Sequence, residues 1–391
     1  MTSDEKVVAH FREQYGTTPE YLVRAPGRIN LIGEHTDYNQ GWVLPAAIDK
    51  AIYFAVKRND SKVCNLTALD LKQSEKVSLP VGPLEGPLWV QYVQGACKVL
   101  ADKGHEVKGF DCVFGGDIPI GAGLSSSAAL DCGCIKAISL LNELNLTDWD
   151  IVEVSNLSNN HWIGIQSGIL DQFASIFGKT GTCMALDCRS RTYERHAVDF
   201  GAFELILIDT HVEHQHTSSG YNDLPALCKE AVVSIRSQGV EIDSLRDLSM
   251  DMLMDVQQFI DQALYSRAQF IVEENARVGA FVEALKQQDI SSLGQLLYAS
   301  HQGLQHLYQV SCLELDLLVD LTREESAVAG ARMMGGGFGG CTLNLVRSTE
   351  VERVVHDITT AYKENTSIDA SVYQVKISDG VEILKTNVDI Y

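Results

Sequence analysis

Strand-like and helix-like patterns are interspersed along this sequence without a regular strand–helix–strand repeat. β-branched and aromatic runs at 51–56 and 110–115 predict strands, and so does the apolar run at 204–210. Apolar residues at helical spacing predict helices over 89–100 and 126–144. Because doubly wound α/β folds alternate strands and helices regularly, this irregular mixture favours an α+β fold.

The later part of the chain is mainly helical in pattern. Helical spacing dominates from 222 to 321. Strands are then predicted at 341–346 and 372–377, with a predicted helix at 351–362 between them. Strands and helices therefore share this half as well, although helices outweigh strands.

The length of the chain predicts two domains. At 391 residues, it is too long for one ordinary hydrophobic core, and its 45% hydrophobic and 21% charged residues are typical of a globular protein. The change of pattern near residue 200 places the predicted domains at residues 1–200 and 201–391.

Charge and cysteine usage exclude several classes of protein. A formal net charge of −21 argues against nucleic acid and anionic membranes as partners, because both require clustered cations. No apolar run is long enough to span a membrane, and the first residues are charged and lack the apolar core of a signal peptide. The ten cysteines lack the paired spacing of a zinc site or a disulfide framework. We therefore expect reduced thiols and a cytoplasmic protein.

A glycine- and serine-rich segment at 119–130 is the first candidate for chemistry. It follows a predicted strand and opens a predicted helix, the setting in which backbone N–H groups and a helix N-terminus surround phosphate. Gly121 and Gly123 leave room for close approach, and Ser125 to Ser127 add hydroxyls for phosphate or Mg²⁺. A strand–helix turn with capping serines remains an equal alternative from this pattern alone.

A second glycine segment, at 335–341, precedes a predicted strand. A dinucleotide-binding loop requires a helix at that point, so that interpretation fails. So many glycines allow the main chain to approach a ligand or another loop closely. Taken alone, the segment is better interpreted as a tight helix-to-strand turn.

A third segment, at 25–39, gathers polar side chains around a short apolar stretch. Glu34, His35 and Asp37 are suited to holding neighbouring hydroxyls of a sugar, because each donates or accepts at fixed angles. Arg28 could supply positive charge to a transferring phosphoryl group. A charged surface loop beside a strand is the simpler alternative for this segment alone.

A histidine cluster invites a metal assignment. His211, His214 and His216 lie with Glu213 after the predicted strand at 204–210. No second group of ligands has matching spacing, so a solvated loop is the preferred interpretation.

Together the three segments resemble the signature motifs of the GHMP kinases, and GRINLIGEHTDYN within the third resembles the signature of the galactokinase branch. The resemblance continues through 164–175, 185–190, 266–275 and 300–316, and covers essentially the whole chain. It implies an N-terminal domain similar to domain 2 of ribosomal protein S5 and a ferredoxin-like C-terminal domain. Both agree with an α+β fold.

The resemblance also implies a role for each matching residue. Members of this branch use ATP and Mg²⁺ to phosphorylate the anomeric hydroxyl O1 of α-D-galactose. Asp171 would accept or orient the O1 proton, and Arg28 would stabilise negative charge. The implied sugar contacts are Glu34, His35, Asp37, Gly168 and Tyr221. The implied nucleotide-binding residues are Gly121, Ala122, Gly123, Leu124, Ser125, Ser126 and Ser127, and the implied Mg²⁺ ligands are Ser127 and Asn159.

The sequence departs from the family pattern in two places. Asn159, five residues before Gly164, stands where the pattern has a glutamate, and an amide oxygen is a poorer Mg²⁺ ligand than a carboxylate. After Tyr221, Leu224 and Pro225 replace two arginines, and Pro225 is expected at the start of a helix. A catalytically silent regulator that binds sugar and nucleotide therefore stays open beside an active kinase.

A kinase for a related sugar such as N-acetylgalactosamine is a further alternative, and it would need room beside the C2 hydroxyl. Mevalonate and homoserine kinases are disfavoured, because neither needs the GEHTDYN cluster. We expect small-molecule substrates and a monomer.

Overall fold

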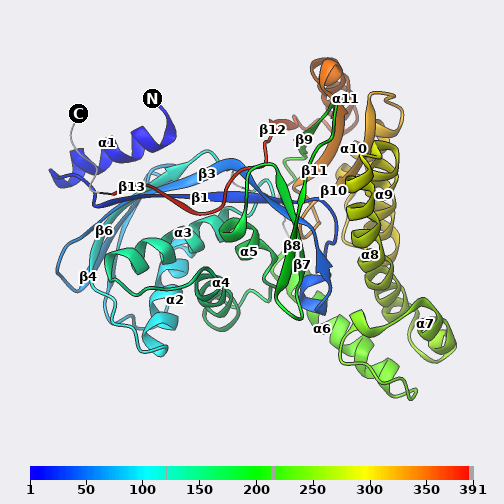
Figure 1. Cartoon of the computed structure of the whole chain (residues 1–391), viewed down its shortest axis with the longest axis horizontal. Helices are drawn as coiled ribbons and strands as arrows, with labels where there is room; N and C mark the ends of the chain where they lie inside the picture. Colours follow the sequence, from blue (N-terminus) through cyan, green and yellow to red (C-terminus); the bar gives the residue numbers. More distant parts are fainter. Residues whose placement is uncertain (120, 213–216, 387–391) are drawn as a thin grey trace.

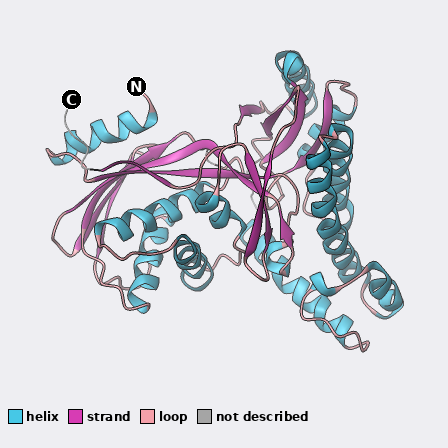
Figure 2. Cartoon of the chain, viewed as in Figure 1, coloured by secondary structure: helices cyan, strands magenta, loops and turns pink. Residues whose placement is uncertain are grey.

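Residues 1–119, 121–212 and 217–386 are described in this computed structural model, with the backbone only for 217–222 and 385–386. Two large sheets lie side by side along the long axis of the molecule, each with its own helices (Figure 1). Figure 2 shows the helices gathered in layers against these sheets. The predicted α+β class is confirmed.

The N-terminal half supplies five strands of a six-stranded sheet in the order β13-β1-β3-β6-β4-β5, and the end of the chain supplies β13. Its strands are β1 (Tyr21–Asn30), β3 (Pro45–Arg58), β4 (Val63–Ala68), β5 (Gln73–Ser78), β6 (Phe110–Gly116) and β13 (Glu382–Thr386). All neighbours are antiparallel except β4 and β6, which are parallel. The strands predicted at 51–56 and 110–115 are confirmed within β3 and β6.

Helices cover both faces of this sheet. Helix α1 (Ser3–Tyr15) lies on one face, and the others lie on the opposite face (Figure 1). These are α2 (Leu88–Asp102), α3 (Ser126–Leu141), α4 (Asp148–Leu157) and α5 (Leu170–Phe177). Strand β1, which lies between β13 and β3, is consequently buried in nine of its ten residues. A side chain at the end of β1 thus enters an environment from which water is largely excluded.

The C-terminal half contains a four-stranded antiparallel sheet in the order β10-β11-β9-β12. Its strands are β9 (Phe203–Asp209), β10 (Val328–Met333), β11 (Cys341–Arg347) and β12 (Ser371–Gln374). Along the chain, helices separate β9 from β10, and α11 (Val351–Thr366) separates β11 from β12. This β-α-β-β-α-β order of elements is the ferredoxin-like arrangement that the resemblance to the GHMP kinases implied.

Helices α9 (Ile290–Gly303) and α10 (Leu313–Arg323) pack against β10 of the second sheet, and the long helix α8 (Gln262–Gln287) packs against α9. Helix α6 (Thr217–Arg236) and the short helix α7 (Met250–Val256) contact α8 and lie away from the sheet (Figure 1). A small sheet of β2 (Trp42–Val43), β7 (Thr182–Asp187) and β8 (Thr192–Ala197) lies between the two large ones (Figure 1). None of the helices in the described ranges is both long and apolar enough to cross a membrane.

Three local expectations were wrong, the third only in its extent. The glycine segment 335–341 lies between two strands, β10 and β11, and so it joins neighbours in one sheet and is not a helix-to-strand turn. Pro225 lies within α6 and does not start it, because the helix already begins at Thr217. The predicted strand at 372–377 is also shorter, since β12 ends at Gln374.

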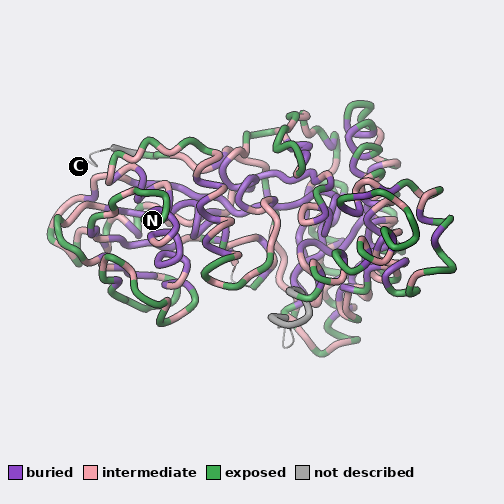
Figure 3. Tube along the Cα trace, turned by 90° about the horizontal axis from the view of Figure 1, so that it is seen from below, coloured by how far each residue is buried: buried purple, intermediate pink, exposed green. Residues whose placement is uncertain are grey.

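The two halves are joined more closely than a boundary near residue 200 suggests. The last strand, β13, returns to the first sheet and pairs with β1. One continuous hydrophobic core contains residues of both halves, among them Phe54 from β3, Phe281 from α8 and Leu343 from β11. Figure 3 shows buried segments running through the middle of the molecule and exposed segments around them. The site lies where these two halves meet.

Candidate active site

One cavity collects most of the residues singled out in the sequence. Its volume is about 330 Å³, and it lies between the segment after β1, the loop before α3, the loop before α5 and the loop after β10. The predicted site residues that line it are Arg28, Glu34, His35, Asp37, Gly121, Gly123, Leu124, Ser125, Ser126, Ser127, Asn159, Gly168 and Asp171. Segments as far apart in the sequence as Arg28 and Gly336 thus line one cavity.

The glycine–serine segment forms one wall of the cavity. Gly121 and Gly123 have φ angles of +82° and +73°, and Ser125, before α3, has a φ of +56°. Such left-handed turns aim successive backbone N–H groups at one point and lead into the N-terminus of a 16-residue helix. Ala122 and Leu124 are buried, at 0% and 1% exposure, and anchor the loop in the core. This wall is suited to hold negatively charged phosphate groups.

An arginine and an aspartate form the centre of the site. Arg28, near the end of β1, donates from Nε to Asp171 Oδ1 at 2.7 Å and from Nη1 to the carbonyl of Gly123 at 2.7 Å. The other carboxylate oxygen of Asp171 accepts a hydrogen bond from the Ser125 hydroxyl at 2.6 Å. The Arg28–Asp171 pair is thereby hydrogen-bonded to the glycine–serine loop before α3. A fixed cation and a carboxylate stand next to each other where a phosphoryl group and a hydroxyl could meet.

Glu34 and His35 form a second wall directly after β1. Glu34 is buried, and its Oε1 accepts hydrogen bonds from Arg332 Nη2 and from the Gly335 N–H, both at 2.8 Å. Burial would raise the pKa of Glu34, but Arg332 and the other cation and N–H nearby hold it below its ordinary value. Glu34 is therefore a carboxylate at neutral pH.

His35 is held as a neutral imidazole. Burial lowers the pKa of His35 to about 4. Its Nδ1 lies 2.7 Å from the Tyr38 hydroxyl, and its ring lies against Tyr308 with the ring centroids 4.8 Å apart. The ring is thus held in one orientation, in which it can exchange hydrogen bonds with a neutral ligand.

Asp37 lies close to the central pair. Its Oδ1 accepts the Tyr38 N–H at 2.9 Å, and its other oxygen lies against Gly168. Burial, followed by the charge of Asp171, raises the pKa of Asp37 to about 7. Near neutral pH this carboxyl can therefore donate as well as accept a hydrogen bond.

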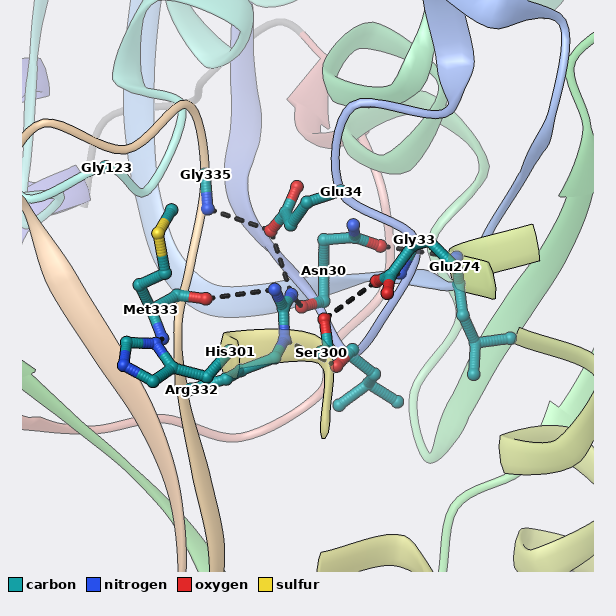
Figure 4. Close-up of polar contacts among 12 residues, drawn as sticks. Asn30, Gly33, Glu34, Gly123, Glu274, Ser300, His301, Arg332, Met333 and Gly335 are labelled. Carbon is teal, nitrogen blue, oxygen red and sulfur yellow. Dashed lines mark hydrogen bonds and ion pairs between the residues drawn. The ribbon is translucent and has the colours of Figure 1, made fainter. Parts of the chain in front are cut away.

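Side chains of the C-terminal half form hydrogen bonds with the segment at 25–39 (Figure 4). The sequence did not predict these contacts. The buried Glu274 of α8 accepts the Gly33 N–H at 2.9 Å and the Ser300 hydroxyl at 2.8 Å. His301, the next residue on α9, lies with Nδ1 3.3 Å from the N–H of Met333. These contacts place the loops on both sides of Glu34. Only the second glycine segment gave a local signal for this region, because Gly335 and Gly336 line the cavity.

Asn159 and Ser127 are the predicted metal ligands. Asn159 is 6% exposed, and its Oδ1 has no hydrogen-bond partner among the described residues. An unpaired buried oxygen in a cavity wall, with a serine hydroxyl on the same cavity, fits a hard cation. Within the described ranges no group of three or more His, Cys, Asp or Glu side chains could hold a metal. His214 and His216 of the histidine cluster, and Glu213, lie outside those ranges.

Two predicted site residues are not placed on the cavity. Ala122 faces the core, where its burial positions the loop. Tyr221 belongs to α6, and its side chain lies outside the described residues. Two aromatic residues that the sequence did not single out, Tyr38 and Tyr92, do line the cavity.

Fold and site together define the class of this protein. Residues 91–179 match the family model described as GHMP kinases N terminal domain, and residues 281–364 match GHMP kinases C terminal. A mevalonate kinase from Methanococcus jannaschii has the same fold at a TM-score of 0.65 and 20% identity, covering 93% of this chain and all of that one. The protein is a GHMP kinase.

Closer matches narrow the class. Residues 9–58 match the galactokinase galactose-binding signature. A galactokinase of Roseiflexus sp. is 36% identical over 95% of both chains, and one of Thermosipho africanus is 37% identical over 93% of this chain and 99% of its own. The crystal structure of Lactococcus lactis galactokinase complexed with galactose superposes at a TM-score of 0.93 with 34% identity, covering 97% and 99% of the two chains. The chain belongs to the galactokinase family.

Proposed function

We propose that this protein transfers the γ-phosphoryl group of ATP to O1 of α-D-galactose, giving α-D-galactose 1-phosphate and ADP. One observation carries the proposal. The Arg28–Asp171 pair is bonded to the glycine–serine loop on one side and shares a cavity with Glu34, His35 and Asp37 on the other. A phosphate-binding wall and a hydroxyl-binding wall thus meet at one cation and one carboxylate.

On the sugar side, three side chains offer different hydrogen-bonding abilities. Glu34 accepts only, neutral His35 can donate and accept, and Asp37 can do either near neutral pH. A hexose presents hydroxyls that both donate and accept, so such a set can fix one orientation of the ring. We propose that these residues, with Gly168 and Tyr221, hold the sugar so that O1 faces Asp171.

On the phosphate side, Asp171 and Arg28 act together. Asp171 accepts the O1–H hydrogen bond and orients the oxygen for in-line attack on the γ-phosphorus. Arg28, which is buried and held by Gly123, places fixed positive charge beside the transferring group. Backbone N–H groups from Gly121 to Ser127 hold the remaining phosphates of ATP. Phosphoryl transfer depends mainly on such positioning and charge stabilisation.

Mg²⁺ is proposed as the accompanying cation, with Ser127 and Asn159 as its protein ligands. The unpaired Oδ1 of Asn159 and the Ser127 hydroxyl on one cavity support this assignment. Mg²⁺ neutralises phosphate charge and keeps several waters or phosphate oxygens as ligands. One weak amide ligand in place of a carboxylate is therefore compatible with activity.

Galactose-dependent release of ADP from MgATP tests the function. We expect turnover in the wild type and a loss of about a hundredfold or more in Asp171→Ala. Asn159→Glu should lower the Mg²⁺ concentration needed for half-maximal rate, because a carboxylate binds the cation more tightly. Wild-type protein that binds galactose and ATP without turnover would instead favour a silent regulator. Faster turnover of N-acetylgalactosamine than of galactose would overturn the substrate.

The setting of the reaction is also proposed. All ten cysteines, which lie in the described part of the chain, are free thiols, and this supports a reducing compartment such as the cytoplasm. We also propose that the protein acts as a monomer. The net charge of −21 supports the absence of nucleic acid as a partner.

A further inference from the structure

A buried arginine lies behind the cavity wall that Glu34 and His35 form. Arg332, on β10, has no exposed surface, and it does not line the cavity. Its Nε donates to the carbonyl of Leu31 at 3.0 Å, and its Nη1 donates to that of Met333 at 2.9 Å. Its Nη2 donates to the carbonyl of Asn30 at 2.5 Å and to Glu34 Oε1 at 2.8 Å. One guanidinium thus joins the end of β1, the strand β10 and a carboxylate of the site.

These bonds determine how Glu34 faces the cavity. Arg332 and the Gly335 N–H both bind Oε1, and the second carboxylate oxygen points away from Arg332 (Figure 4). A carboxylate held through one oxygen keeps the other available to a ligand. Because Glu34 and Arg332 are 298 residues apart, this orientation depends on the packing of the two halves.

Only a guanidinium can make this set of contacts. Arginine presents five N–H donors in a planar fork, whereas lysine carries one ammonium group at the end of a flexible chain. A lysine at position 332 would keep the charge near Glu34 but could not bind Leu31, Asn30 and Met333 at the same time. The charge and the geometry can therefore be separated by mutation.

We propose that Arg332 is a positioning residue for sugar recognition. By holding Oε1 of Glu34 from behind, it orients the free oxygen of that carboxylate toward one hydroxyl of the sugar. The inference rests on the proposed function, because it assigns Arg332 to the binding of the same sugar. Arg332 acts only through Glu34 and the loop around it.

A series of singly deoxygenated galactoses tests this role. In the wild type, the ratio of galactose to deoxygalactose affinity measures the contribution of each hydroxyl. Glu34→Gln should remove that preference at one hydroxyl, and this identifies the hydroxyl held by Glu34. Arg332→Lys should weaken galactose binding about tenfold or more, lose the preference at that same hydroxyl, and leave the KM for ATP within about twofold.

Arg24→Lys is the matched control. Arg24 is also a buried arginine on a strand, and it donates to the carbonyls of Ile48 and Asp379 and to the Ser378 hydroxyl, away from the cavity. Its replacement should lower stability without changing any deoxygalactose ratio. If Arg332→Lys weakens all the sugars equally, as a loosened fold would, the positioning role is overturned.

A double variant covers the case in which a single substitution prevents folding. Removing one member of a buried ion pair leaves an uncompensated charge, whereas removing both does not. Arg332→Met in the Glu34→Gln background should add less than about a twofold loss of galactose affinity, because no carboxylate remains to be positioned. A further large loss would show that Arg332 acts by another route. If the wild type neither binds nor phosphorylates galactose, the proposed function itself fails. If the wild type is active and Arg332→Lys behaves like Arg24→Lys, only the positioning role fails.

Discussion

Replacing Gly168 by alanine tests how closely the Asp37 carboxylate packs against this glycine. Gly168 lies just before α5, and a Cβ atom built on it would lie 2.0 Å from Asp37 Oδ2 and 2.3 Å from Asp37 Cγ. Ordinary van der Waals contact begins at 3.4 Å, so the Asp37 carboxylate would have to move by more than an ångström. The φ of Gly168 is not in the left-handed region, so alanine adds a clash and no backbone strain.

The displacement should be expressed as a loss of sugar binding. A hydrogen bond to a charged group contributes about 1.5–3 kcal/mol, and losing one from Asp37 should raise the KM for galactose about 10- to 100-fold. The KM for ATP should stay within about twofold, because the loop at 121–127 is not touched. Initial rates of ADP release at varied galactose and varied ATP separate the two effects.

Gly279→Ala is the control for a glycine substitution of the same size. Gly279 is exposed on α8, and a Cβ there would meet no atom within 4 Å. It should increase the free energy of unfolding by about 0.5–1 kcal/mol and leave both KM values unchanged. A Gly168→Ala enzyme with a wild-type KM for galactose would refute the reasoning, and so would one whose KM for ATP rises equally.

Two further predictions concern the pH dependence of stability. Asp187 accepts two hydrogen bonds from Arg246. Burial alone would raise the pKa of Asp187, but these bonds and two backbone N–H groups lower that pKa to about 2. The resulting stabilisation of roughly 2 kcal/mol is fully present above the unfolded pKa near 4 and is lost as the pH falls through about 2. The deficit of Asp187→Asn in urea unfolding should therefore be constant above about pH 5 and shrink below about pH 4; a deficit independent of pH would contradict this. The contribution of Asp37 to stability changes with pH in the opposite direction. Burial and the charge of Asp171 raise the pKa of Asp37 to about 7, so ionisation of this carboxyl destabilises the fold as the pH rises from about 4 through 7. Asp37→Asn should raise the free energy of unfolding above that of the wild type by more at pH 8 than at pH 5, and it should weaken galactose binding. Equal increases at the two pH values would contradict this prediction.

Local patterns in the sequence predicted the elements that depend on near neighbours. Apolar spacing located β3, β6, α2 and α3, because helix and strand periodicities reflect which side chains share a face over a few residues. The position of the glycine–serine loop between β6 and α3 was also readable, whereas its role in phosphate binding stays a prediction. The resemblance of the whole chain then connected three separate segments that, taken singly, each had an ordinary alternative.

Tertiary structure decided what lies behind those segments. No local pattern shows that Arg332 meets Glu34 or that Glu274 meets Gly33, because these partners are more than 200 residues apart. Flanking structure also changed the meaning of the second glycine segment, which joins two neighbouring strands.

The sequence by itself thus determined the class of fold and identified most of the side chains that line the cavity. It did not determine how those side chains are charged or oriented. A buried carboxylate such as Glu34 stays ionised only where a cation and hydrogen-bond donors surround it, and a second one, Asp37, takes up a proton near pH 7 where they do not. That difference arises from burial and from distant partners, which exist only once the two halves of the chain have packed together.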